Sequence, residues 1–236
     1  MALAMNVNII LPPRSYFNKT HININGRPKT KKHISDLFWH SNEIAGHLIP
    51  VTCHLRTQVR DIIRQIFFVN PRETIHADEK TLVIHIRSGD IFRSKNPHPD
   101  YIMPPLCFYT NIIKELGDQI DKIHLIAEDA FNPCINLLQE KYPNLVFKKS
   151  SLDEDVKVIM GAKRIVYGAG TFIPELLAVF NDSFTEIYRS SNAYKPSLLV
   201  KHSYKDNVID ISDYIDKMGS WKNTPEQCQL MCDYVF

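Results

Sequence analysis

Long apolar runs and a strong excess of charge of either sign are both missing from this sequence. Its 236 residues include no stretch near the roughly 20 apolar residues that a membrane span requires. The opening segment is too short and too uncharged for a signal peptide. With 28 lysines and arginines against 26 acidic residues, the net charge of +2 gives no reason to expect nucleic acid as the main partner. We therefore expect a soluble, cytoplasmic protein with no membrane span.

Motifs that hold metals or bind nucleoside triphosphates are missing as well. The histidines lack the spacing of a zinc site. Asp153 and Asp155 have the Asp-x-Asp spacing by which a metal can bridge a sugar diphosphate, but they begin a predicted helix instead of ending a strand. No phosphate-binding loop of the triphosphatase type and no Gly-x-Gly-x-x-Gly after the first predicted strand occur. We expect no metal and no other cofactor. The five cysteines lack a Cys-x-x-Cys pair and suit reduced thiols: Cys53, Cys107, Cys134, Cys228 and Cys232.

What the sequence does contain, from residue 81 onward, is an alternation of short β-branched runs and longer amphipathic runs. This pattern predicts an α/β fold with a parallel, Rossmann-like sheet. The hydrophobic share of 44% is ample for a core. The predicted strands are 81–87, 122–127, 144–147, 164–167 and 186–188, and the predicted helices are 104–116, 132–142, 153–162, 174–180 and 224–234.

Before residue 77 the pattern changes. Residues 6–11 read as one strand, residues 18–32 are polar and rich in turns, and residues 52–68 read as one long helix. We infer a small amino-terminal lobe over residues 1–76, as a candidate acceptor side, and an α/β domain over residues 77–236. A helix packed directly onto the α/β half is the alternative.

Polar residues follow the predicted strands at the point where each one ends. In an open parallel sheet these ends share one edge, where ligands bind. Arg87 offers a planar fork for two phosphate oxygens, and glycines before a helix let backbone amides approach an anion. Taken singly, Arg87 with Asp90 also reads as a surface ion pair, and the glycines as a simple turn. The strand-end residues are Arg87, Asp90, Glu128, Asp129, Asp155, Gly168, Gly170 and Thr171.

The order of these segments resembles the nucleotide-binding half of the inverting fucosyltransferases with the GT-B fold. His85-Ile-Arg87-Ser88-Gly89-Asp90 is similar to the family's His-x-Arg-Arg-x-Asp motif, with serine in place of the second arginine. The Glu128-Asp129 pair is similar to the Asp-Asp that ends the family's next strand. Asp155, followed by a strand and Gly170-Thr171-Phe172, resembles the third block. The resemblance covers about residues 81–182 and lacks the family's opening Gly-x-Gly-Asn-Gln segment, as in a domain of a multi-domain glycosyltransferase.

The resemblance implies a donor site for a nucleotide-diphosphate sugar. Arg87 would hold the β-phosphate within the motif opened by His85, and Asp90 would orient that motif. Thr171 and Phe172 would line the diphosphate and sugar, Asp155 would face the base, and Gly170, Glu128 and Asp129 would complete the donor-binding set. The implied activity is metal-independent, inverting transfer of fucose from GDP-fucose to a glycan hydroxyl. Two alternatives stay open: another donor, such as rhamnose or xylose on UDP or GDP, and a non-catalytic module that binds a nucleotide sugar or glycan.

Such a transfer also needs a group that takes the proton of the acceptor hydroxyl. The candidates are His98 and Asp100 in the loop after the motif, and Glu43 or His47 in the first lobe. All four read equally well as solvated surface residues. Tyr101, Phe108 and Tyr109 are candidates for a sugar-stacking face, although the helical spacing around them is more typical of a core: residues 104–116.

Overall fold

The computed structural model of the chain describes residues 9–10, 21–22, 60, 64, 75, 77–196, 200 and 202–236. It divides into two compact units, residues 1–71 and 72–236. In the first unit, β1 (Ile9–Ile10) and β2 (His21–Ile22) pair antiparallel, and residues 60 and 64 are helical. The remainder of the predicted lobe lies outside the described residues, so its boundary at residue 76 stays a prediction.

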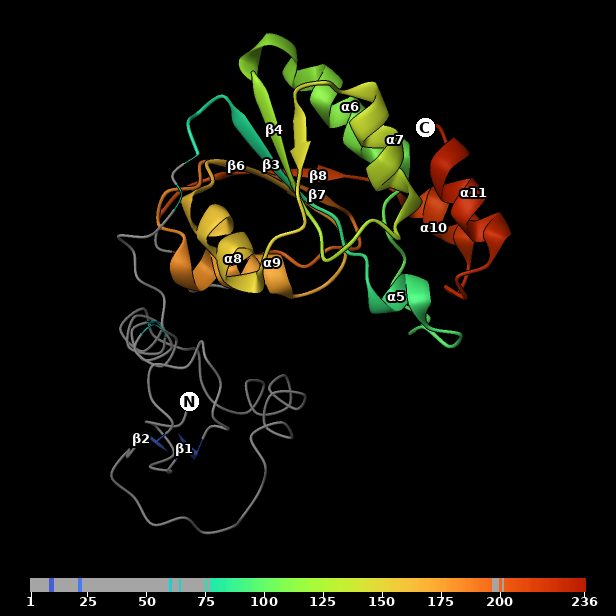
Figure 1. Cartoon of the computed structure of the whole chain (residues 1–236), viewed down its shortest axis with the longest axis horizontal. Coiled ribbons are helices and arrows are strands. Elements are labelled where there is room, and N and C mark those ends of the chain that lie inside the picture. Colours follow the sequence, from blue (N-terminus) through green and yellow to red (C-terminus); the bar gives the residue numbers. More distant parts are fainter. Residues whose placement is uncertain are drawn as a thin grey trace. The chain divides into compact units, whose positions relative to one another are not determined.

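The second unit is built on a six-stranded parallel sheet (Figure 1). Its spatial order is β5-β4-β3-β6-β7-β8, and each neighbouring pair runs parallel. Counted from β3, this is the 3-2-1-4-5-6 strand order of the Rossmann fold. The prediction of an α/β fold with a Rossmann-like parallel sheet is confirmed. The strands are β3 (Thr81–His85), β4 (Lys122–Ile126), β5 (Leu145–Phe147), β6 (Arg164–Tyr167), β7 (Glu186–Ser190) and β8 (Lys205–Ile209).

Both faces of the sheet are buried, which explains the continuous apolar character of its central strands. Leu82 and Ile84 of β3 point into one core, and Val83 between them points into the other. All three are fully buried. Burial of a side chain of this kind contributes about 1.5–3 kcal/mol to the stability of the fold. The central strands therefore give the loops at their carboxyl ends fixed starting points.

Two groups of helices cover these faces (Figure 1). The first group packs over the core that contains Leu82, and the second over the core that contains Val83. The first group comprises α6 (Leu106–Leu116), α7 (Pro133–Lys141), α10 (Ser212–Met218) and α11 (Pro225–Asp233); the second comprises α8 (Leu152–Gly161) and α9 (Phe172–Phe180).

Side-chain caps start three of these helices and fix their directions. The Asn132 side chain accepts the Cys134 amide at the start of α7. Ser151 and Glu154 form a capping box on α8, and Thr224 does the same with Gln227 on α11. Pro225 follows the Thr224 cap at the first position of α11, where a missing amide proton costs nothing. In α8 the cap is Ser151, and Asp155 lies in the first turn of the helix.

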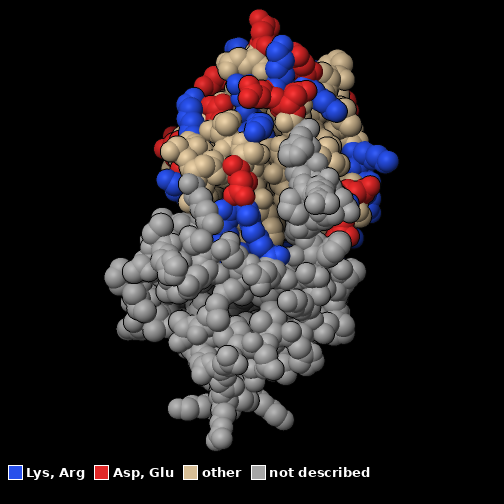
Figure 2. Space-filling view, turned by 90° about the vertical axis from the view of Figure 1, so that its left-hand side faces the viewer, with Lys and Arg blue, Asp and Glu red and all other residues tan. Residues whose placement is uncertain are grey.

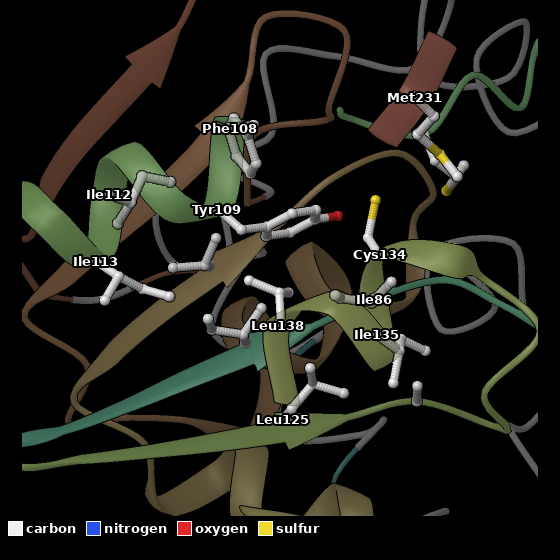
Figure 3. Close-up of a cluster of buried hydrophobic side chains, with 14 of the residues drawn as sticks. Ile86, Phe108, Tyr109, Ile112, Ile113, Leu125, Cys134, Ile135, Leu138 and Met231 are labelled. Atoms are coloured by element: carbon white, nitrogen blue, oxygen red, sulfur yellow. The ribbon is translucent and has the colours of Figure 1, made fainter. Parts of the chain in front are cut away.

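The aromatic pair in α6 belongs to the core. Phe108 and Tyr109 are 0% and 1% exposed, and Figure 3 shows Tyr109 pointing toward Cys134 of α7 with Leu138 beneath it. Burial raises the pKa of Tyr109 well above its usual value. The alternative of a sugar-stacking face at these two residues is therefore wrong.

Several elements differ from the sequence prediction. The edge strand β8 was not predicted, because its sequence Lys-Asp-Asn-Val-Ile is mostly polar, as suits an edge strand. Helix α10 was not predicted either. The short helix α5 (Asp90–Arg93) was also missed. Strand β3 ends at His85, so Arg87 lies in the following loop. Pro104 was predicted in the first turn of α6 but precedes that helix.

The described surface carries mixed charge. Figure 2 shows one face of the molecule, and acidic and basic side chains are interspersed over the described part of it. Among the described residues, no helix combines the length and the apolar character that crossing a bilayer demands.

Candidate functional site

The strand order creates a topological switch point between β3 and β6. The chain runs outward from β3 through β4 to β5, and outward from β6 through β7 to β8. His85 and Tyr167 are register partners at the carboxyl ends of β3 and β6. The loops that follow them lead to helices on opposite faces of the sheet, and in open α/β folds ligands bind beyond the strand ends at such a switch point.

His85 and Phe172 connect the two loops across this switch point. Their rings lie 5.8 Å apart in a tilted arrangement. Burial, and secondarily the neighbouring Arg87 charge, lower the pKa of His85 to about 4. The imidazole is therefore neutral near pH 7 and can exchange hydrogen bonds with a ligand without adding charge.

Arg87 lies two residues beyond the end of β3 and faces two carboxylates. One of its terminal nitrogens is 2.5 Å from an Asp90 oxygen, and the other is 4.0 Å from Glu128. Its side chain is 37% exposed. The ion pair with Asp90 that the sequence suggested is confirmed, and it holds the guanidinium while leaving it open to solvent.

Asp129 ties the loop after β3 to its surroundings. Its carboxylate accepts hydrogen bonds from the Ser88 hydroxyl at 2.5 Å, the Gly89 amide at 3.1 Å and the Arg93 guanidinium at 2.5 Å. The Phe131 amide adds a fourth at 3.2 Å. Burial alone would raise the pKa of Asp129, but the hydrogen bonds from these four residues outweigh burial and lower it.

Ser88 explains why an arginine is absent at this position. Its side chain is 1% exposed, and its hydroxyl donates to Asp129 while accepting the Asn132 amide at 3.0 Å. The Asn132 side chain in turn donates to the Arg87 carbonyl at 3.1 Å. A long cationic side chain has no room there. The loop after β3 is thus locked to the start of α7.

Glycine at position 89 makes the turn possible. Gly89 has φ of 66°, and a Cβ there would collide with the Glu128 carboxylate, which lies directly against its backbone. The positive φ favours glycine, and a side chain at position 89 would also require the Glu128 carboxylate to move. Position 89 therefore controls where Glu128 sits.

The loop after β6 is built differently. Gly168 packs against the Pro104 ring so closely that a Cβ would lie 2.5 Å from it. Gly170 adopts φ of 103°, with open space around it. Thr171 occupies the cap position of α9 but makes no side-chain cap hydrogen bond, and Phe172 is 39% exposed. The first amides of a helix have no partner within it, so this loop presents backbone donors at the positive end of α9.

Asp155 stands apart from this pair of loops. It lies in the first turn of α8, after the edge strand β5, and hydrogen bonds with Ser150. Burial raises the pKa of Asp155. No described hydrogen bond or ion pair joins it to Arg87, so its role toward a nucleotide base stays a prediction.

The candidate bases are not drawn into the site by any described contact. His98 and Asp100 have side chains 61% and 88% exposed, in the loop after α5. The Asp100 amide donates to His98 Nδ1 at 3.3 Å, and no described hydrogen bond or ion pair connects either residue to Arg87. Glu43 and His47 lie outside the described residues.

Arg93 is the residue of this site that sequence reasoning missed. It pairs with Asp129 and Glu128, and its guanidinium lies 4.9 Å from the centre of the Phe131 ring. Its spacing three residues after Asp90 was a weak signal, because the short helix α5 was not predicted. In the part of the chain that the structure describes, no group of three or more histidine, cysteine or acidic residues is arranged to hold a metal ion.

Comparison with known proteins gives little. No protein-family model and no curated protein matches the chain. Among solved structures, the chain is similar to E. coli ADP-heptose lps heptosyltransferase II at 15% sequence identity and a TM-score of 0.35. The similarity covers 65% of this chain and 42% of that one, so the chain spans less than half of that protein's length.

Proposed function

We propose that residues 77–236 bind the diphosphate of a nucleotide sugar at the switch point and transfer the sugar to a hydroxyl group without a metal. One observation carries the proposal: Arg87 and the glycine loop before α9 follow the carboxyl ends of β3 and β6, the two adjacent strands at the switch point. This is the place where a Rossmann-like sheet binds phosphorylated ligands. The two loops offer complementary groups, a guanidinium fork on one side and backbone amides on the other.

These groups suit the chemistry of sugar transfer. When the bond between sugar and phosphate breaks, negative charge builds up on the departing diphosphate. Arg87 and the amino end of α9 would receive that charge in fixed positions, a preorganised effect often worth about 3–4 kcal/mol for one key group. His85, neutral at pH 7, would hydrogen bond to the diphosphate without changing the total charge.

The donor is proposed from the resemblance to inverting fucosyltransferases. Fucose on GDP is the first choice, with Thr171 and Phe172 beside the sugar and Asp155 facing the base. The half-exposed Phe172 ring provides an apolar surface of the kind that a 6-deoxysugar contacts. Rhamnose or xylose on UDP or GDP is the alternative, since none of these residues reads one sugar alone. The acceptor would be a glycan hydroxyl, and His98 and Asp100 remain candidate bases.

A second candidate function is a non-catalytic module that binds a nucleotide sugar or a glycan within a larger protein. The observation that favours it is the exposure of both candidate bases, at 61% and 88%, since a catalytic base works within hydrogen-bond reach of the acceptor.

Thermal-shift measurements with GDP and UDP, each with and without EDTA, test the proposal. We expect one nucleotide diphosphate to raise the melting temperature, with the shift unchanged by EDTA. Incubation with the matching sugar donors should then release the nucleotide in the presence of a glycan acceptor. A shift without turnover of any donor would favour the binding module. Absence of any shift, or a shift that requires a divalent metal, would contradict the proposed function.

A further inference from the structure

We propose that Arg93 is a second anion-binding residue of the donor site and that Glu128 occupies the space between Arg93 and Arg87 until a diphosphate displaces it. This inference rests on the proposed function and extends it to Arg93, which the sequence did not indicate, and to a specific role for Glu128. It makes the site a pair of arginines held apart by a replaceable carboxylate.

The geometry around Glu128 is the starting point. One oxygen of its carboxylate is 4.0 Å from Arg87, and the other is 3.6 Å from Arg93. Direct hydrogen bonds between a guanidinium and a carboxylate are shorter, at about 2.7–2.9 Å. The Glu128 side chain is 56% exposed. Glu128 is therefore held loosely between two cations, as an anionic ligand would be.

Both arginines are fixed by other partners and would stay in place if Glu128 moved. Arg87 pairs with Asp90 at 2.5 Å, and Arg93 pairs with Asp129 at 2.5 Å. Arg93 also lies over the Phe131 ring. A guanidinium has five N–H donors, so one firm ion pair on each arginine leaves other donors for a ligand.

The carboxyl-terminal segment holds the short helix that carries Arg93. The Trp221 indole donates to the Ile91 carbonyl at 3.0 Å, and the Asn223 side chain donates to the Phe92 carbonyl at 2.8 Å. The rings of Phe92 and Trp221 also pack edge to face at 5.3 Å. These contacts give α5, which has only four residues, a fixed position from which Arg93 reaches the site.

Charge balance explains why Glu128 has to leave. The two guanidinium groups face three carboxylates, those of Asp90, Glu128 and Asp129. A diphosphate would meet net negative charge unless one carboxylate moves away. Asp129 is 11% exposed and accepts four hydrogen bonds, and Asp90 is paired at 2.5 Å. Glu128 lies against the Gly89 backbone, and its only ion pairs among the described residues are the two long contacts with the arginines.

Titration calorimetry with inorganic pyrophosphate in EDTA at low salt tests the inference. Glu128→Gln keeps the shape of the side chain and removes its charge, so we expect it to bind pyrophosphate about threefold to tenfold more tightly than the unmodified protein. Arg93→Ala should bind about tenfold more weakly, and Arg93→Lys should fall between, because lysine keeps the charge but loses the fork.

Two control variants remove equal charges elsewhere. Glu140→Gln changes an exposed residue of α7. Arg164→Ala removes the ion pair with Glu186 at the amino-terminal end of β6, which is the end opposite the candidate site. Both should bind pyrophosphate within about twofold of the unmodified protein. Melting temperatures identify a variant that has lost its fold. If Arg93→Ala unfolds, the pyrophosphate affinity of Glu128→Gln, a change at an exposed side chain, tests the inference instead.

The possible results separate this inference from the proposed function. Unchanged or weaker binding by Glu128→Gln, or unchanged binding by a folded Arg93 variant, overturns the inference. If Arg87→Ala abolishes pyrophosphate binding and the Arg93 and Glu128 variants leave it unchanged, the proposed donor site is supported and this inference is overturned. If the expected affinity pattern is found but no sugar donor is ever turned over, this inference stands and the transferase falls. Failure of both the unmodified protein and Glu128→Gln to bind overturns both.

Discussion

The two loops that flank the switch point are built on opposite principles. The loop after β3 is tied down by side chains: Ser88 and Gly89 bond to Asp129, and Asn132 bonds to the Arg87 carbonyl. The loop after β6 has few such ties, since Gly170 stands in open space and Thr171 makes no side-chain cap hydrogen bond. We refer to the loop after β3 as the braced loop and to the loop after β6 as the bare loop.

The difference shows what each loop can contribute. A guanidinium near a sheet edge needs counter-charges and fixed partners, because an isolated charge that loses water is costly. The braced loop provides these partners, so Arg87 is available in one position. Backbone amides need no such support, so the bare loop can present them without side-chain partners.

Removal of Arg87 should have the largest effect, because the bare loop cannot replace its charge. We expect Arg87→Ala to lower kcat/KM for the sugar donor by about 100-fold to 1,000-fold, or about 3–4 kcal/mol. Arg87→Lys should retain part of the activity. Steady-state kinetics with the donor identified by thermal shift measures the effect. A loss below tenfold for Arg87→Ala would show that the braced loop does not carry the site.

Breaking the brace itself should cost stability more than activity. Asp129→Ala removes the acceptor for Ser88, Gly89 and Arg93, and we expect it to lower the free energy of unfolding by about 2–3 kcal/mol. The matched change in the bare loop, Thr171→Ala, should alter it by less than about 0.5 kcal/mol. Urea denaturation measures both. Equal losses would mean that the two loops do not differ in the way described.

His85, which joins the loops through Phe172, should make the protein sensitive to acid. Its folded pKa of about 4 lies below the ordinary histidine value of 6.5, so between these values the unfolded chain binds a proton that the folded protein does not. Stability contributed by neutral His85 is therefore complete above pH 6.5 and is lost as the pH falls toward 4.

We expect this loss to reach about 2 kcal/mol, allowing for the partial exposure of the residue. The difference in unfolding free energy between pH 7 and pH 4.5 should be smaller in His85→Gln than in the unmodified protein. Urea denaturation at both pH values measures it. The same pH dependence in both proteins would rule out His85 as the source.

The smallest expected difference lies between two glycine substitutions. Gly89→Ala meets both a positive φ and the Glu128 carboxylate, whereas Gly170→Ala meets a positive φ in open space. We expect each to destabilise the fold because of its positive φ, with Gly89→Ala worse by up to about 0.5 kcal/mol because the exposed Glu128 carboxylate has to move. Thermal denaturation of both variants gives the comparison. A larger loss for Gly170→Ala would indicate that the bare loop is the more constrained one.

Much of the site was predictable because strand ends are local features. A buried apolar run that ends in Arg87, or in Glu128 and Asp129, places these residues at one edge of any parallel sheet. Arg93 was not predictable in this way. Its role depends on Asp129, 36 positions away in the chain, and on a four-residue helix that shows no periodic pattern.

Local patterns were enough to predict the α/β alternation, the strands β3 to β7 and the polar residues at their ends, because hydrophobic periodicity and turn residues act over a few neighbouring positions. The pairing of β3 with both β4 and β6 comes from the folded chain, and this pairing places the switch point beside Arg87. The burial of Ser88 and the position of Glu128 between two arginines come from the folded chain as well. These features arise from pairing and packing between distant segments, which no local pattern encodes.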